Sequence, residues 1–138
     1  MGRGLNELEW MTFIGNSGAV PLSVIDTDLI WAGVSRVRIA HCIVKGGRVG
    51  INIRNVGTAS NDRLIEAEIL SNEVVDNLVQ FGQGILVGNF RGATRAIVRA
   101  YLTGNHVHSN KVGLRAFNSS DTNLSNITII FRANYRRL

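Results

Sequence analysis

The chain has few residues that could stabilise it covalently or anchor it in a membrane. It contains one cysteine, Cys42, among 138 residues, so no intramolecular disulfide can form and stability must come from packing. No run approaches the 18 consecutive apolar residues of a membrane-spanning helix, and residues 1–4 lead into polar positions instead of a signal-peptide core. We expect a soluble chain with no membrane partner and no export signal of its own.

Acidic residues are scarce in the C-terminal half. Residues 1–76 hold nine acidic and seven basic side chains, whereas residues 77–138 hold one acidic and eight basic. Such an excess favours polyanionic partners, namely acidic polysaccharide, nucleic acid or anionic lipid, although it can also serve solubility alone. Helix-turn-helix, zinc-finger and aromatic RNA-binding motifs are absent, so we expect no specific nucleic-acid partner.

A strand-like pattern recurs along the chain. Two alternating apolar residues are followed by Asn or Cys and then by Val, in full copies at residues 37–44, 67–74 and 100–107. Met11, Phe13 and Asn16 form a partial copy before these, and Ile127 and Ile129 begin another after them. Period-two alternation predicts strands with one buried face.

A second pattern follows each full copy. It reads Gly, aliphatic, any residue, small aliphatic, any residue, Asn, at residues 50–55, 84–89 and 113–118, and we align residues 21–26 with it in the first coil. The interval from the Asn or Cys to the Gly is eight residues in two coils but twelve from Asn72 to Gly84. We therefore predict a local insertion around residues 78–83.

Strands that recur in the same order at a fixed interval pair in parallel with their own copies one coil away. The sequence thus predicts an all-β fold, a right-handed parallel β-helix (solenoid) of about five coils. One domain spans residues 1–138, either alone or as part of a longer parent protein. No window has a convincing helical period.

Asparagine at the predicted bends suggests a stacked amide ladder. Asn72 and Asn105 occupy equivalent places, where Asn tolerates a left-handed backbone and can bond to its copy in the next coil. Asn16 and Cys42 complete the column. We interpret Cys42 as a small buried substitute in the ladder rather than as a reactive thiol.

The segments VRIAHCIVKGGRVGINIRN, AEILSNEV with GILVGN, and YLTGNHVHSNKVGLRAFN resemble the right-handed parallel β-helix family, the pectate-lyase-like superfamily. That superfamily includes polysaccharide lyases, pectin hydrolases, mannuronan epimerases and phage tailspike domains. The resemblance implies a polysaccharide partner and an extracellular parent protein. It also implies outer clusters of Asp or Glu that bind calcium or act as acid and base, but this chain has no such cluster.

In-register stacking places outward residues of successive coils in columns about 4.8 Å apart. One predicted column reads Thr12, Arg38, Glu68, Tyr101 and Thr128, and its neighbour reads Arg36, Glu66, Arg99 and Asn126. Because Arg faces Glu across one coil in both columns, we predict surface ion-pair ladders.

The candidates for catalysis or metal binding are weak. Glu66 and Glu68 share a face, but each has an Arg to neutralise it, and Asp26 with Asp28 is explained equally well by a turn. His106 and His108 flank Val107 as two potential zinc ligands, with Asp76 as a candidate third, although two outward polar residues is the simpler interpretation. We assign no catalytic residue, no metal and no cofactor.

The outer face of the second pattern offers the best candidate site. Its columns are Asn52, Leu86, Arg115 and Arg54, Gly88, Phe117. We expect Gly88 to leave a depression between a cation and a ring, with the inserted segment walling one side. The predicted substrate-binding residues are Asn52, Arg54, Phe81, Gly88, Arg115 and Phe117.

Three functions remain open. The leading hypothesis is a non-catalytic module that interacts with an anionic polysaccharide through this face, since Arg binds carboxylates and rings stack on sugars. The alternative is a small polysaccharide lyase or epimerase that acts on uronic acid polymers. The third is a structural β-helix without ligand, which forms a homo-oligomer by pairing of exposed strand edges at the solenoid ends.

Overall fold

The structure of the chain is a computed structural model, which describes residues 5–15, 23–29, 33–56, 63–78, 82–90, 95–118 and 125–132. These residues form strands in three parallel sheets, without a helix among them. In this described part of the chain, no helix is long and apolar enough to cross a membrane.

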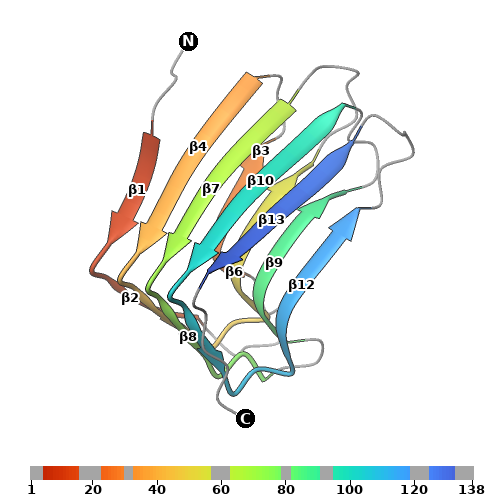
Figure 1. The fold of residues 1–138 in the computed structure, drawn as a ribbon. Helices are drawn as coiled ribbons and strands as arrows, with labels where there is room; N and C mark the ends of the chain where they lie inside the picture. The colour runs from red at the N-terminus through yellow and green to blue at the C-terminus, as the bar shows by residue number, and fades with distance from the viewer. Residues whose placement is uncertain are drawn as a thin grey trace.

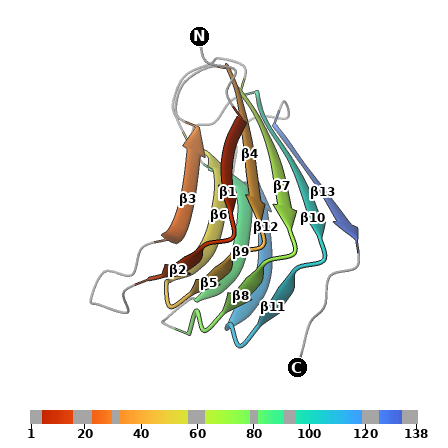
Figure 2. The same ribbon diagram turned by 90° about the vertical axis from the view of Figure 1, so that its left-hand side faces the viewer.

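Three sheets enclose the interior (Figures 1 and 2). Sheet A has the order β1-β4-β7-β10-β13 and consists of β1 (Leu5–Glu9), β4 (Gly33–Ala40), β7 (Arg63–Leu70), β10 (Ala96–Thr103) and β13 (Asn126–Arg132). Sheet B has the order β11-β8-β5-β2 and consists of β2 (Thr12–Ile14), β5 (Ile43–Lys45), β8 (Glu73–Val75) and β11 (His106–His108). Sheet C has the order β12-β9-β6-β3 and consists of β3 (Ser23–Leu29), β6 (Val49–Asn55), β9 (Gln83–Asn89) and β12 (Val112–Asn118).

The chain visits sheets A, B and C in turn and then moves one strand along, so that every pairing is parallel. This confirms the predicted all-β parallel β-solenoid. The predicted count of about five coils is too high. Three regular coils occupy residues 33–118. Before them, β1, β2 and β3 form a more exposed first round, and after them β13 adds one further strand to sheet A beside β10.

Strand register agrees with both sequence patterns in the middle coils. Val37 pairs with Ala67, Ile39 with Ile69, and the latter with Leu102. In sheet C the predicted Ile51–Ile85 pair is present as well. The repeated Gly and Asn positions are therefore reliable markers of register here.

Register at the two ends differs from the prediction. Phe13 pairs with Val44, so the partial copy of the first pattern at residues 11–16 is wrong, and β1 is the partner of β4. Ile25 pairs with Ile51, which places the first-coil copy of the second pattern three residues later than predicted. At the other end Ile130 lies beside Tyr101, in the place predicted for Thr128.

Aliphatic side chains fill the interior. Ile39, Ile69, Val74 and Ile85 have no solvent exposure. Truncating one such side chain to Ala costs about 2–5 kcal/mol, because the cavity left behind closes only partly. The coils are therefore stabilised mainly by stacked aliphatic columns.

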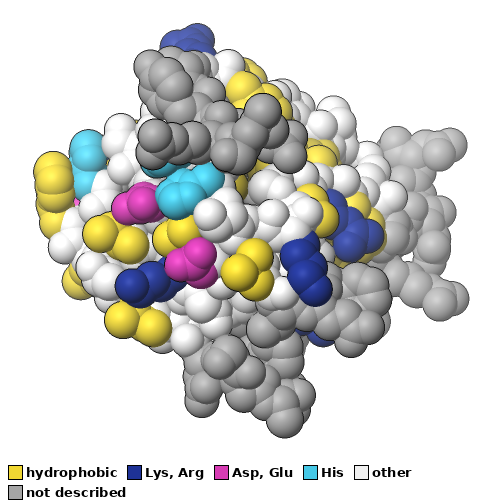
Figure 3. Space-filling model, turned by 90° about the horizontal axis from the view of Figure 1, so that it is seen from below, with side chains coloured by type: hydrophobic (Ala, Val, Ile, Leu, Met, Phe, Trp, Pro, Cys, Tyr) yellow, Lys and Arg dark blue, Asp and Glu magenta, His cyan; other side chains and the backbone are white. Residues whose placement is uncertain are grey.

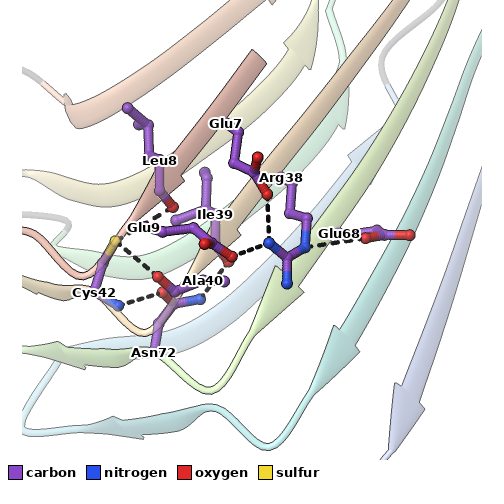
Figure 4. A network of polar contacts seen from close by, with 9 residues as sticks. All are labelled: Glu7, Leu8, Glu9, Arg38, Ile39, Ala40, Cys42, Glu68 and Asn72. Carbon is purple, nitrogen blue, oxygen red and sulfur yellow. Dashed lines mark hydrogen bonds and ion pairs between the residues drawn. The ribbon is translucent and has the colours of Figure 1, made fainter. Parts of the chain in front are cut away.

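The predicted amide ladder is present at the A–B corner, and Figure 4 shows the contact between Asn72 and Cys42. Asn72 donates to Asn105 Oδ1 at 3.0 Å and to the Ile39 carbonyl at 2.9 Å, and it accepts from the Cys42 backbone N–H at 2.9 Å. Cys42 is 1% exposed, as predicted for a small buried substitute. Asn16 lies outside the described residues.

The left-handed residue at this corner is not the asparagine. Positive φ occurs one residue earlier, at Trp10, His41, Ser71 and Gly104. The asparagine side chain instead bonds across coils. The predicted role of Asn in tolerating a left-handed backbone is therefore wrong.

A second ladder, not predicted, stands at the B–C corner. Asn77 accepts from the Gly47 N–H at 3.0 Å and donates to Asn110 Oδ1 at 2.7 Å. Since Gln83 pairs with Val49, the extra residues of this coil lie between Asn77 and Gln83. The predicted insertion is thus where the spacing placed it, between two fixed points of the repeat.

One charged residue lies among the core residues. Arg63, the first residue of β7, is 2% exposed and pairs in register with Gly33 and Ala96. Its guanidinium makes no side-chain hydrogen bond to the described residues. Such burial costs several kcal/mol, which the surrounding packing must offset.

Candidate functional site

A cleft of about 420 Å³ runs across the outer face of sheet C. Strands β3, β6, β9 and β12 supply its floor, and residues just before or after them supply its edges. Its lining residues are Ser23, Asp26, Arg48, Val49, Asn52, Arg54, Gln83, Leu86, Phe90, Arg115 and Phe117. The cleft therefore spans several coils.

Arginine and phenylalanine dominate the chemistry of this cleft. The Arg54 guanidinium lies 5.0 Å from the centroid of the Phe90 ring, and that of Arg115 lies 5.5 Å from the Phe117 centroid. The two rings meet edge to face, with centroids 4.4 Å apart. Each guanidinium therefore lies over the face of a ring in a cation–π contact.

Asp26 is the carboxylate among the lining residues. Its Oδ1 accepts from Asn52 at 2.9 Å, and its Oδ2 lies 3.7 Å from the Arg54 guanidinium. Asp26 belongs to β3, so the turn interpretation of this pair of aspartates is wrong. Among the described lining residues, three arginines and one carboxylate give an excess of positive charge.

Gly88 does not line the cleft, contrary to the prediction of a depression at this residue. It is buried, and a Cβ there would lie 3.0 Å from Phe117 Cδ1 and 3.3 Å from Phe90 Cε2. Because Gly88 has no side chain, the two rings can pack directly over its backbone. The hollow lies beside the rings, over Asn52 and Leu86.

Four predicted site residues come together in this cleft: Asn52, Arg54, Arg115 and Phe117. The column Asn52, Leu86, Arg115 is in register as predicted, as is the column of Arg54, Gly88 and Phe117. Asn52 is 1% exposed, so it supports the floor through Asp26. Phe81 lies outside the described residues.

Sequence reasoning missed Arg48 and Phe90, which also line the cleft. Each lies one residue outside a strand, where the alternation of strand residues assigns no direction to a side chain. Phe90 follows directly after Asn89 of the second pattern, so its aromatic character at a strand end was the available signal.

Sheet A carries the predicted ion pairs on its outer face. Arg36 Nε lies 2.8 Å from Glu66 Oε2, and the other oxygen of Glu66 lies 3.6 Å from Arg99. Arg38 pairs with Glu68 at 3.6 Å. Each of these two glutamates therefore has a cation beside it, and the pair does not resemble a catalytic acid and base.

Arg38 has two further partners in the first coil (Figure 4). Its guanidinium pairs with the carboxylates of Glu7 and Glu9. Glu7 stands in the place that the sequence analysis assigned to Thr12, since β1 is the partner of β4. The guanidinium thus faces acidic residues in both adjacent coils.

The two histidines of β11 gather with a glutamate on sheet B. His108 Nε2 lies 3.1 Å from Glu73 Oε1, and the rings of His106 and His108 lie 4.3 Å apart. Asp76, the candidate third ligand, is not part of this group, and Glu73, which is in register with His106, takes that place. The sequence did contain a signal for Glu73. Asn72 aligns with Asn105, so the residues that directly follow them, Glu73 and His106, align as well.

No protein-family model, curated protein or solved structure matches the chain. Functional inference therefore rests on the parallel β-solenoid, the cleft of sheet C and the histidine–glutamate group of sheet B.

Proposed function

We propose that this chain is a non-catalytic β-helix module that binds an anionic polysaccharide along the cleft of sheet C. The observation that carries the proposal is the gathering of Arg48, Arg54 and Arg115 with two phenylalanine rings in one cleft. Guanidinium groups bind carboxylates and sulfates with paired hydrogen bonds, and aromatic rings pack against the apolar faces of sugars.

The shape of the site supports a polymer rather than a small anion. Its lining residues come from consecutive coils, and neighbouring strands in a sheet lie about 4.8 Å apart. A linear chain laid across the strands therefore meets a new set of side chains at each coil. This arrangement also supports membership of the pectate-lyase-like superfamily, in which polysaccharides are the usual partners.

Asp26 supports binding over catalysis. It is held by Asn52 and Arg54, and no second carboxylate lies beside it among the described lining residues. Hydrolases of sugars need two carboxylates at a defined separation. A lyase or epimerase stays the alternative, and it predicts new unsaturated ends, or inverted residues, in a uronate polymer incubated with the protein.

The test is affinity electrophoresis in gels containing alginate, polygalacturonate or a sulfated glycan at low salt. We expect retardation of the wild-type protein that weakens as salt increases. The double variant Arg54→Gln, Arg115→Gln should lose at least about tenfold in affinity, because it removes two charge-assisted contacts. Arg36→Gln, Arg99→Gln is the matched control, since it removes the same charge from sheet A.

Three results would contradict the proposal. They are an absence of retardation in every gel, an equal loss in both double variants, and equally tight binding of DNA of matched charge. Circular dichroism and thermal melting of each variant establish that the fold is intact before the comparison is made. If unsaturated ends appear in the polymer, the proposed ligand stands but the proposed non-catalytic role is wrong.

The last regular coil supports a second candidate function, self-association. Ala116 is exposed, although it pairs in register with Val87, which has no solvent exposure. We propose that a second copy of the chain stacks on this end. Sedimentation should reveal a dimer that the variant Ala116→Glu abolishes, and a monomer at every concentration contradicts this candidate.

A further inference from the structure

Sheet B carries a group of histidine and glutamate side chains, residue types that can ligate a metal, and this group is separate from the sheet C cleft. Its residues are Glu73 on β8 and His106 and His108 on β11. Figure 3 views the molecule from the side of sheet B and shows histidine side chains next to acidic ones. Each residue offers one ligand atom, and these atoms all lie within 4.8 Å of one another.

The spacing of these atoms fits a tetrahedral ion. Zinc bonds of about 2.0–2.2 Å put neighbouring ligand atoms about 3.3–3.5 Å apart. His108 Nε2 and Glu73 Oε1 are already 3.1 Å apart. Because all three ligand atoms lie within 4.8 Å of one another, His106 has to approach by at most about 1.5 Å.

The backbone beneath the three residues is fixed. His106 pairs with Glu73 in the parallel ladder, and its N–H donates to the Asn72 carbonyl at 2.8 Å. Asn110 donates to the His108 carbonyl at 2.8 Å and to the Val74 carbonyl at 2.8 Å. The site therefore rests on two stacked strands rather than on a loop.

A further hydrogen bond sets the orientation of one imidazole. His108 Nδ1 lies 3.2 Å from the Ser109 hydroxyl, while Nε2 faces Glu73. An Nδ1–H that donates to the hydroxyl leaves the lone pair on Nε2 for a metal ion. Metal-binding histidines are commonly held by such a contact on the other ring nitrogen.

We propose that Glu73, His106 and His108 bind one divalent transition-metal ion of the Zn²⁺ class. Two imidazoles and one carboxylate favour Zn²⁺, Cu²⁺ and Co²⁺ over Ca²⁺ and Mg²⁺, which prefer all-oxygen sites. The side chains of Glu73 and His108 are 43% and 21% exposed, so water has access to the fourth position. The ion links β8 to β11 and so joins the last regular coil to the one before it.

The test uses the full chain, freed of metal with a chelator and then titrated with ZnCl₂ by calorimetry. We expect one Zn²⁺ per chain and a rise of about 5–10 °C in the thermal midpoint at saturation, because the ion binds only the folded strands. Co²⁺ should give the visible absorption bands of four-coordinate cobalt. Ca²⁺ should produce neither effect.

Single substitutions identify the ligands. His106→Gln, His108→Gln and Glu73→Gln should each weaken Zn²⁺ binding by at least about tenfold, in line with the loss of one of three ligands. His41→Gln is the matched control, since His41 stacks on Trp10 at another corner, and Asp76→Asn tests the competing carboxylate. Neither control should change the affinity.

The proposal is overturned if the three ligand variants bind Zn²⁺ as tightly as the wild-type chain. Ca²⁺ binding as tight as Zn²⁺ binding overturns it too, because an oxygen site would then be present. The thermal midpoint of each variant without metal shows whether it folds. The near-isosteric Glu73→Gln keeps the test decisive if a histidine variant is unstable.

Discussion

Arginine has different neighbours on the outer faces of sheets A and C. On sheet A, arginine alternates with glutamate from coil to coil, as in Arg36, Glu66 and Arg99. On sheet C, arginines gather with aromatic rings around one carboxylate, Asp26. The content of each column, not the total charge of the chain, decides what a face can bind.

The difference has an energetic reason. An exposed ion pair contributes about 0–1 kcal/mol, but it neutralises its own field and penalises a shift in strand register. Cations gathered on one face repel each other instead, and a polyanion relieves that repulsion when it binds. Sheet A therefore favours pairing among its own side chains, whereas the proposed function gives the arginines of sheet C a polyanionic ligand.

The largest expected effect comes from reversing one charge on each face. Arg115→Glu in the cleft should lower the affinity for polygalacturonate by about 30-fold, because it removes a cation and adds a repulsive carboxylate. Glu66→Arg on sheet A should raise the affinity by less than about threefold. Fluorescence titration measures both, and changes of equal size would show that only net charge matters.

The next effect tests the packing beneath the cleft. Gly88→Ala should destabilise the chain by about 1–3 kcal/mol, because its Cβ would press on both phenylalanine rings. Gly113→Ala is the control, since the nearest atom to its Cβ would be 3.8 Å away. Urea unfolding measures both, and an equal loss would mean that the rings move aside without cost.

A smaller effect is expected for the hub of sheet A. Arg38→Met should cost about 1 kcal/mol, because three glutamates would lose the guanidinium that they face. Arg99→Met, which removes one ion pair with Glu66, should cost less. Equal values in thermal unfolding would argue against the hub.

The smallest effect concerns a single ladder member. Glu66→Gln should cost about 0.5 kcal/mol or less at low salt, and the difference should disappear in 1 M NaCl, where screening acts within about 3 Å. The measurement is urea unfolding at both salt concentrations. A cost that persists in high salt would indicate packing rather than charge.

The register of the middle coils could be predicted from sequence because the repeated glycines occupy places where a side chain would clash with the next coil. A Cβ on Gly50 would lie 2.7 Å from the Gly84 carbonyl oxygen, and one on Gly84 would lie 2.6 Å from the Gly113 carbonyl oxygen, so a side chain is excluded at both places. The first coil has Val24 at this place, one residue before Ile25 in register. Alternation alone then permits several alignments, and the predicted alignment differs from the observed one by three residues.

The candidate sites were predictable only in part, for a related reason. Register places Asn52 and Arg115 in one column, but it cannot reveal that two rings would fill the space above Gly88. Nor does alternation reach Phe90, which lies past the end of β9. Side-chain direction outside the strands depends on tertiary packing, which no local pattern encodes.

The extra residues between Asn77 and Gln83 show that this coil can be longer than its neighbours while its strand pairing stays the same. Both flanking residues keep their partners in the neighbouring coils, so the corner has been lengthened without a change in strand pairing. Because the entropy of closing a loop grows slowly with its length, longer segments should be accepted here at small cost. For protein engineering, this corner is therefore the natural place to graft a binding peptide beside the cleft.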